Sequence, residues 1–176
     1  MLFRSLTATA RPPELEDVLR RRGYEAGFSV SVRTRPIETA RPPAGVVIER
    51  HPTPLWLEAK ARIGGRGERT RHLPALLGRI ADPAAFASAA VGNTVAGIGL
   101  AVVTEEHAGI FDLAVDPDHR RRGLATAVIG ALSSWAAERG ATRAYLQVET
   151  SNRPALELYD RLGFCEVYRY WYRVLR

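Results

Sequence analysis

The spacing of apolar residues predicts alternating strands and helices from residue 44 onward. Ala144, Leu146 and Val148 alternate with polar neighbours, which is typical of a half-buried strand. Short apolar runs predict further strands at residues 46–49, 86–90, 95–103 and 110–115. The dipeptide Gly92-Asn93 is a turn sequence between two of these runs, so it predicts a β-hairpin there.

Helical spacing is clearest over residues 123–139, where apolar residues lie 4, 7 and 11 positions after Leu124 and Gly140 follows the end. A second helix is predicted over residues 152–162. Its inward face consists of Ala155, Leu158, Tyr159 and Leu162. Two further helices are predicted at residues 54–63 and 72–80, joined by a glycine-rich loop at residues 64–67. A chain with strands and helices in this alternation is expected to be α/β.

The N-terminal segment is marked off by proline pairs at residues 12–13 and 42–43, because consecutive prolines interrupt both helices and central strands. Between them the pattern predicts a short helix closed by Gly23, and then a strand through residues 28–32.

The same order of helix, glycine–aromatic stop and strand recurs at the C-terminal end. Gly23-Tyr24 corresponds to Gly163-Phe164 at an offset of 140 residues. A glycine stop before an aromatic residue is also a common helix cap, so a chance match is the alternative. We interpret the N-terminal segment as the remnant of a duplicated domain. Leu19 corresponds to Tyr159 at this offset, so the remnant lacks that hydroxyl and is predicted to be structural, not catalytic.

Composition excludes several classes of protein. With 46% hydrophobic and 25% charged residues among 176, the chain is typical of a globular protein, and no apolar run approaches membrane-spanning length. The N-terminus lacks the apolar core of a secretion signal, and one cysteine cannot form an intramolecular disulfide; we therefore expect a cytoplasmic protein without a membrane partner. Cys165 is expected to be a packing residue. Four scattered histidines argue against a metal site.

The chain is basic, with a net charge of +6. Lys60 is the only lysine among its 25 basic residues, and these residues are spread along the sequence without an interleaved aromatic stripe. Nucleic-acid binding is therefore not favoured.

The segment after the predicted strand 110–115 carries the clearest functional pattern. Asp116-Pro117 makes a turn, Arg120, Arg121 and Arg122 follow, and a helix begins at Gly123. A helix N-terminus presents unpaired backbone N–H groups and a positive dipole, so this order predicts a binding site for an anion such as pyrophosphate. The alternative is an ordinary arginine-rich turn in which Gly123 eases the backbone.

Two motifs resemble the GNAT superfamily of acyl-CoA N-acyltransferases: Arg120-x-x-Gly123-x-Ala125, and Asn152-x-x-Ala155-x-x-Leu158-Tyr159-x-x-x-Gly163-Phe164. The resemblance covers residues 45–176, and residues 1–44 look like the tail of a first, degenerate copy. It implies an α/β fold with a mixed, strongly twisted sheet, helices on both faces and a splayed, V-shaped cofactor cleft.

The resemblance also implies the donor and the residues that bind it. The pantetheine arm of acetyl-CoA would pair with the strand ending at Val115, whose N–H would polarise the thioester carbonyl, and the pyrophosphate would meet residues 120–126. Asn152 is expected to cap its helix and to contact the pantetheine. The implied donor-binding residues are Leu113, Ala114, Val115, Arg120, Arg121, Arg122, Gly123, Leu124, Ala125, Thr126 and Asn152.

The implied reaction is direct transfer of an acetyl group to a primary amine in a ternary complex, with the amine acceptor unknown and no metal. In the family, a tyrosine at the place of Tyr159 protonates the departing thiolate; the alternative is an ordinary core tyrosine. Asp112 is the best-placed general base, residues 105–107 are weaker candidates, and Glu149 could bind the amine. A non-catalytic acyl-CoA-binding or scaffold module is the alternative function.

The family's final pair of antiparallel strands is incomplete in this sequence. Only about a dozen residues follow Gly163-Phe164, and residues 168–172 supply one strand. The other strand could come from residues 28–33 or from a second subunit in a homodimer. We hypothesise that the N-terminal remnant supplies it.

Overall fold

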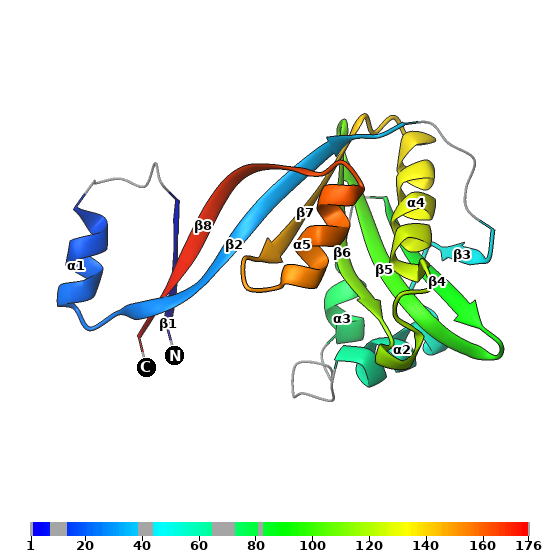
Figure 1. The fold of residues 1–176 in the computed structure, drawn as a ribbon, viewed down its shortest axis with the longest axis horizontal. Coiled ribbons are helices and arrows are strands. Elements are labelled where there is room, and N and C mark those ends of the chain that lie inside the picture. Colours follow the sequence, from blue (N-terminus) through cyan, green and yellow to red (C-terminus); the bar gives the residue numbers. More distant parts are fainter. Residues whose placement is uncertain (1, 8–13, 39–43, 65–72, 81–82, 176) are drawn as a thin grey trace. The chain divides into compact units, whose positions relative to one another are not determined.

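The computed structural model describes residues 2–7, 14–38, 44–64, 73–80 and 83–175 (Figure 1). The chain divides into two compact units, one formed by Met1–Arg35 with Leu146–Arg176 and the other by Pro36–Tyr145. Among the described residues, no helix is both long enough and apolar enough to cross a membrane.

The unit Pro36–Tyr145 is built on four antiparallel strands in the order β6-β5-β4-β3. In chain order its elements are β3 (Val46–Glu49), α2 (Pro54–Gly64), α3 (Leu73–Leu77), β4 (Ala84–Val91), β5 (Thr94–Thr104), β6 (His107–Val115), a 3₁₀ turn (Pro117–His119) and α4 (Leu124–Ala137). The predicted hairpin is confirmed, because β4 and β5 pair antiparallel up to Val91↔Thr94, and Gly92 adopts a φ of 59° in the turn between them. Strand β7 (Arg143–Glu149) begins in this unit and ends in the other.

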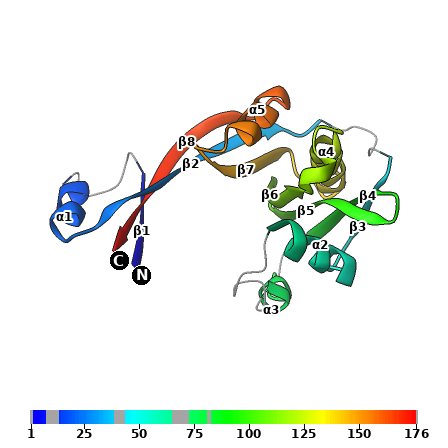
Figure 2. The same cartoon turned by 60° about the horizontal axis from the view of Figure 1, so that its bottom comes forward.

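Helices α2 and α4 cover opposite faces of these strands (Figure 2). Ile98 and Leu100 of β5 pack on the α2 side, in a cluster with Trp56. A Cβ placed on the intervening Gly99 would lie 2.7 Å from Val128 Cγ1 of α4, so the other face of β5 is in close contact with that helix. Because side chains alternate between the two faces of a strand, the small residues of β5 allow α4 to approach closely.

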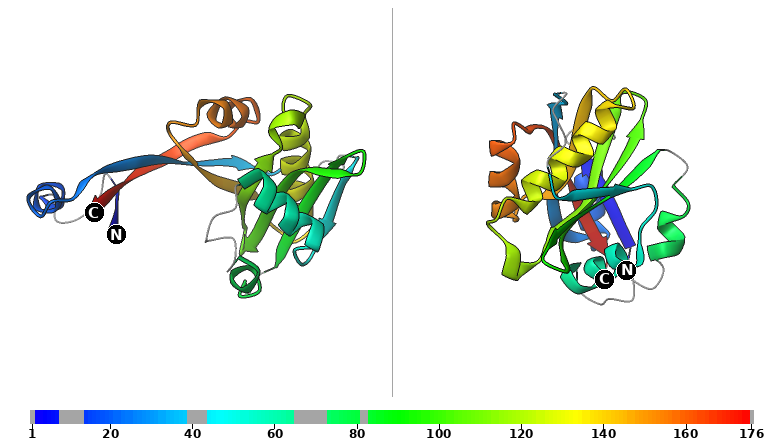
Figure 3. Two further views of the ribbon diagram at one scale, coloured as in Figure 1. Left: turned by 90° about the horizontal axis from the view of Figure 1, so that it is seen from below. Right: turned by 90° about the vertical axis from the view of Figure 1, so that its right-hand side faces the viewer.

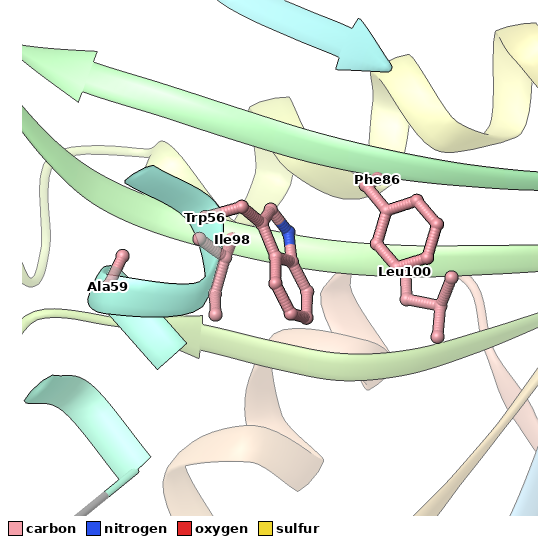
Figure 4. Close-up of a cluster of buried hydrophobic side chains, with 5 residues drawn as sticks. All are labelled: Trp56, Ala59, Phe86, Ile98 and Leu100. Carbon is pink, nitrogen blue, oxygen red and sulfur yellow. The ribbon is translucent and has the colours of Figure 1, made fainter. Parts of the chain in front are cut away.

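The α2 side of this unit holds an aromatic core (Figure 4). The Trp56 ring meets Phe86 of β4 edge to face, with centroids 5.3 Å apart. Its indole nitrogen donates a hydrogen bond of 3.3 Å to the Gly99 carbonyl, so the polar atom of this buried side chain is satisfied.

The other unit is a three-stranded antiparallel ribbon in the order β1-β8-β2, with two helices (Figures 1 and 3). Its elements are β1 (Leu2–Thr7), α1 (Leu15–Arg21), β2 (Glu25–Pro36, of which residues 25–35 belong here), α5 (Arg153–Arg161) and β8 (Cys165–Leu175). β2 pairs with β8 from Glu25↔Val174 to Thr34↔Cys165. The N-terminal segment of the chain therefore supplies the missing antiparallel partner, as predicted, and no second subunit is required for it.

Several predicted bounds need correction. The helix predicted over residues 72–80 is only α3, because the chain then closes tighter i→i−3 turns, from Arg79 N–H to the Leu76 carbonyl at 3.1 Å and from Ile80 N–H to the Leu77 carbonyl at 3.3 Å. Residue 72 lies outside the described residues, as do most of the glycine-rich loop and the two proline pairs. Strand β1 was not predicted at all. The expectation that Cys165 packs inside is wrong, because its side chain is exposed at the first position of β8.

Candidate functional site

A bulge in β6 shapes the strand that the sequence analysis assigned to the donor. Leu100 pairs with Phe111 and Ile98 pairs with Ala114, so Gly99 faces two residues of β6, Asp112 and Leu113. Asp112 has a φ of 51°, in the left-handed region that aspartate tolerates better than most residues. The extra residue interrupts the ladder and increases the local twist of β6, which is how bulges redirect a strand beside a binding site.

Asp116 organises the turn after β6. It is 8% exposed, and its backbone N–H donates to the Ala96 carbonyl at 2.8 Å. Its carboxylate accepts the N–H of Asp118 at 3.1 Å, which caps the 3₁₀ turn, and it forms an ion pair with Arg62 of α2. The Asp-Pro turn is therefore held by buried polar contacts, as well as by the restricted φ of Pro117.

The start of α4 presents unpaired backbone donors. Gly123 is its N-cap, with a φ of 78° and no side-chain cap, and the first helical bond runs from Ala127 N–H to the Gly123 carbonyl at 2.9 Å. The N–H groups of Leu124, Ala125 and Thr126 therefore have no acceptor within the helix. Together with the helix dipole, they make this end of α4 suited to an anion.

Three consecutive arginines directly precede this helix start in the chain. Arg121 has a φ of 63°, so two left-handed residues, Arg121 and Gly123, lie two positions apart. Arg120, Arg121 and Arg122 are exposed, and none of them forms an ion pair within the described ranges. The predicted helix 123–139 is thus corrected to Leu124–Ala137, because Gly123 has the non-helical geometry of a cap.

Helix α2 contributes two residues to this region that the sequence analysis did not identify. Lys60 Nζ lies 2.7 Å from Asp112 Oδ1, and Arg62 binds both Asp116 and, at 2.6 Å, the Val95 carbonyl. The two carboxylates lie more than 50 residues from their cationic partners in the chain, so no local pattern in the sequence connects them.

The unit Met1–Arg35 with Leu146–Arg176 holds the other two predicted site residues, both on α5. Asn152 accepts a 3.3 Å hydrogen bond from the Ala155 N–H and so caps this helix as predicted. Tyr159 is 7% exposed and contacts the Phe164 ring with centroids 5.9 Å apart. Burial raises the pKa of the Tyr159 phenol, which keeps it protonated at neutral pH. Its hydroxyl has no hydrogen-bond partner in the part of the chain that the structure describes.

The weaker base candidates, residues 105–107, and Glu149, which was expected to bind the amine, lie at two separate positions. Glu105 has a φ of 54° in the turn from β5 to β6, and the Glu106 carbonyl accepts the Thr142 N–H at 2.8 Å, so residues 105–107 have a turn-forming role. Glu149 ends β7 and accepts a weak 3.4 Å hydrogen bond from the Ser151 hydroxyl. Neither position has the ion-paired setting of Asp112.

A polar pocket of about 470 Å³ lies on the α5 side of the β2–β8 ribbon. Two ion pairs, Arg33–Asp160 and Arg169–Glu166, occupy its walls. The hydrogen bond from Arg169 holds the pKa of Glu166 below its usual value, and a 2.7 Å hydrogen bond from the buried Ser31 hydroxyl adds to this effect. The Arg33–Asp160 pair joins β2 to α5, whereas Arg169–Glu166 lies within β8 and is linked to β2 by the Ser31 hydrogen bond.

The fold, the bulge in β6 and the start of α4 together indicate the class of protein. This is a mixed α/β protein in which a bulged strand is followed by an arginine-rich turn and an uncapped helix N-terminus, an arrangement that suits an anion. Among the described residues, no group of His, Cys, Asp and Glu side chains is arranged to hold a metal ion.

Residues 52–164 match the Acetyltransferase (GNAT) family, and the chain belongs to that family. It is 35% identical over 130 residues to the [Ribosomal protein bS18]-alanine N-acetyltransferase of Escherichia coli K12, covering 74% of this chain and 78% of that protein. It is 28% identical over 129 residues to the uncharacterized N-acetyltransferase YobR of Bacillus subtilis, covering 73% of this chain and 52% of YobR.

Solved structures share the fold. A GCN5-related N-acetyltransferase from Sphaerobacter thermophilus superposes with a TM-score of 0.74 at 20% identity, over 97% of this chain and 58% of that one. A tandem GNAT protein from the clavulanic acid biosynthesis pathway gives a TM-score of 0.70 at 14% identity, over 98% and 61%. The chain thus spans a little over half the length of YobR and of these two structures, and it matches the predicted mixed α/β class.

Proposed function

We propose that this protein is an acetyl-CoA-dependent N-acetyltransferase that transfers the acetyl group directly to a primary amine. The observation that carries the proposal is the uncapped start of α4, because its three unpaired N–H groups and the adjacent arginines suit the pyrophosphate of the donor. Acetyl-CoA is the donor that the family uses.

In the proposed reaction the deprotonated amine attacks the thioester carbonyl, a C–N bond forms, and the C–S bond breaks. The Val115 N–H stabilises the oxyanion, and Leu113 and Ala114 bind the donor through their backbone. Asp112, directly or through water, accepts the proton of the amine, and Tyr159 donates a proton to the departing thiolate. The raised pKa of Tyr159 supports its assignment as the acid, since the phenol holds its proton at neutral pH. Asn152 contacts the pantetheine in addition to capping α5.

For the acceptor we propose the N-terminal amine of a protein. The support is the 35% identity, over most of both chains, to an enzyme named for an alanine of a ribosomal protein. An amine screen should therefore include a peptide that begins with alanine, the same peptide with a blocked N-terminus, a lysine peptide and a polyamine.

We also propose that residues 1–44 are the remnant of a first GNAT copy, joined to a GNAT domain at residues 45–176. The ends of α1 and α5 support this. Gly23 and Gly163 have φ values of 80° and 79°, and the residue after each donates to the carbonyl five positions earlier, at 3.0 and 2.9 Å. The tandem arrangement named for one structural neighbour is a precedent for such a chain.

Titration with acetyl-CoA by calorimetry, followed by an assay of thiol release with the amine panel, tests the function. We expect micromolar binding and release of thiol with at least one amine. A folded protein that does not bind acetyl-CoA contradicts the proposal. Binding without thiol release from any amine would favour a non-catalytic acyl-CoA-binding module instead.

Two glycines offer a matched pair of variants for this titration. Gly123 and Gly92 both have positive φ, and a Cβ on either would meet nothing within 4 Å, so an alanine at either position strains only the local backbone. We expect Gly123→Ala to weaken acetyl-CoA binding about tenfold by moving the first N–H groups of α4. Gly92→Ala, in the β4–β5 hairpin, should leave the dissociation constant unchanged.

A further inference from the structure

Two cationic side chains of α2 bind the two ends of one segment of β6. Lys60 Nζ lies 2.7 Å from Asp112 Oδ1, and Arg62 is paired with Asp116. Between these carboxylates lie residues 113–115, to which the proposed function assigns the reactive end of acetyl-CoA. One helix thus anchors both ends of the donor-binding segment.

The first anchor supports a backbone that is intrinsically strained. Asp112 has a φ of 51° at the bulge, a conformation that L-residues rarely adopt. Its side chain is 30% exposed and that of Lys60 is 24% exposed, so water only partly replaces the ion pair if one partner is removed. The Lys60–Asp112 pair therefore favours the bulged shape over a regular strand.

The other contacts of α2 reinforce the same region. Trp56, one turn before Lys60, donates its indole N–H to the carbonyl of Gly99, the residue opposite the bulge. Arg62 joins Asp116 to the Val95 carbonyl of β5, which fixes the end of β6 against its neighbour. Of the three residues of α2 that make these contacts, Trp56, Lys60 and Arg62, only Lys60 binds the bulged residue Asp112 itself.

We propose that Lys60 is a positioning residue for the acyl donor: through Asp112 it holds the backbone of residues 113–115 in the shape that binds acetyl-CoA. This inference rests on the proposed function, since it assumes that the donor occupies that segment. Lys60 acts through Asp112, so it is expected to govern donor affinity. Because Asp112 is also the proposed base, the affinity for the donor, and not kcat, is the quantity that tests this role.

The first test replaces Lys60 with methionine, which removes the ammonium and keeps an unbranched side chain. We expect the Kd for acetyl-CoA, measured by calorimetry without an amine, to rise about tenfold. Lys60→Arg should restore most of the affinity because it keeps the charge. Glu58→Met is the control, since Glu58 is exposed on the same helix and forms no ion pair within the described residues.

A second variant separates positioning from a general loss of stability. Glycine adopts a φ of 51° without strain and carries no carboxylate, so Asp112→Gly removes both reasons for needing Lys60. The double variant K60M/D112G should therefore bind acetyl-CoA more tightly than K60M alone. This comparison uses the dissociation constant, so the loss of a base at position 112 does not affect it.

The outcomes distinguish this inference from the function on which it rests. Absence of acetyl-CoA binding by the wild type refutes the proposed function. If the wild type binds and K60M binds equally well, only the role of Lys60 is refuted. If K60M does not fold, the double variant decides: recovered folding and binding support positioning, and failure to recover both overturns it.

Discussion

Val30 of β2 pairs with Tyr170 of β8, which is the residue 140 positions further along the chain. The neighbouring pairs are Ser29↔Trp171 and Ser31↔Arg169. Moving each residue of the first pair by 140 positions, from one strand to the equivalent place in the other, gives the second pair. The bulges agree as well: the ladder shifts register once between Ala26 and Ser29 and once between Val32 and Arg33, on the two sides of Val30. The ribbon therefore has a local twofold relationship centred on Val30 and Tyr170.

This symmetry explains why the N-terminal segment fits β8. Under the duplication proposed above, β2 and β8 are two copies of one ancestral strand and pair as they would in a symmetric dimer. The equivalent positions of the two helix ends, Leu19 and Tyr159, are both buried, and only the second carries a hydroxyl.

The first prediction concerns the contribution of β2 to stability. Val30 is 5% exposed, so Val30→Asp buries an unpaired charge and should destabilise the protein by about 3 kcal/mol or more. Val167 on β8 is 60% exposed, and Val167→Asp should change stability by less than about 0.5 kcal/mol. Urea unfolding of both variants provides the comparison.

Deletion of residues 1–40 should cause unfolding or aggregation, and a stable, active truncation would show that β2 is dispensable.

The second prediction concerns the acid. Tyr159→Phe removes the proton donor and keeps the buried ring, so kcat should fall by about 10²-fold or more while the Kd for acetyl-CoA stays unchanged. Tyr24→Phe is the matched control, because Tyr24 is a buried tyrosine at the end of α1 and should tolerate the change. Unchanged turnover in Tyr159→Phe would remove Tyr159 from the mechanism.

The pH dependence of the same reaction gives a third prediction. Burial raises the pKa of Tyr159 above its usual value of 10, so the phenol keeps its proton through the neutral and mildly alkaline range and loses it only as the pH rises through the higher value. The Tyr159 contribution to kcat should therefore be constant from pH 7 to about pH 9. A Tyr159-dependent decrease in kcat, absent from Tyr159→Phe, that began near pH 8 would contradict the assignment.

The arginine-rich turn and the helix start that follows it were predictable because their determinants are local. A turn, three arginines and a glycine lie within eight residues, and the periodicity after Gly123 fixes the helix that they precede. The Lys60–Asp112 and Arg62–Asp116 pairs were not predictable, since they depend on how α2 packs against β6. The left-handed conformation of Asp112 was also missed, because nothing in the apolar run that contains it indicates a bulge.

Close packing of α4 on β5 gives the fourth prediction. A Cβ on Gly99 would lie 2.7 Å from Val128 Cγ1 and 3.0 Å from Leu132 Cδ1, so Gly99→Ala should destabilise the protein by about 1–3 kcal/mol. Gly97 faces the same helix, but its nearest contact would be an ordinary 3.4 Å, to Ala89 Cβ. Gly97→Ala should therefore be neutral or slightly stabilising. Equal losses of stability in both variants would show that the room between β5 and α4 does not determine the effect.

The fifth prediction concerns acid sensitivity of the ion pairs around β2. The hydrogen bond from Arg169, with a smaller effect from Ser31, lowers the pKa of Glu166 in the folded protein. Its contribution to stability is therefore present above the ordinary value of 4.5 and is lost as the pH falls through the lower folded value. Glu166→Gln should lower Tm at pH 7 by about 2–4 °C, as expected for a partly exposed ion pair contributing up to about 1 kcal/mol.

At pH 3 the two proteins should melt closer together, because the wild-type carboxylate is then becoming protonated. Glu157→Gln is the control, since Glu157 lines the same pocket and forms no ion pair within the described residues. A Tm difference for Glu166→Gln that stayed the same from pH 7 to pH 3 would mean that the amide disturbs packing, and that the Glu166 charge does not stabilise the junction of β2 and β8.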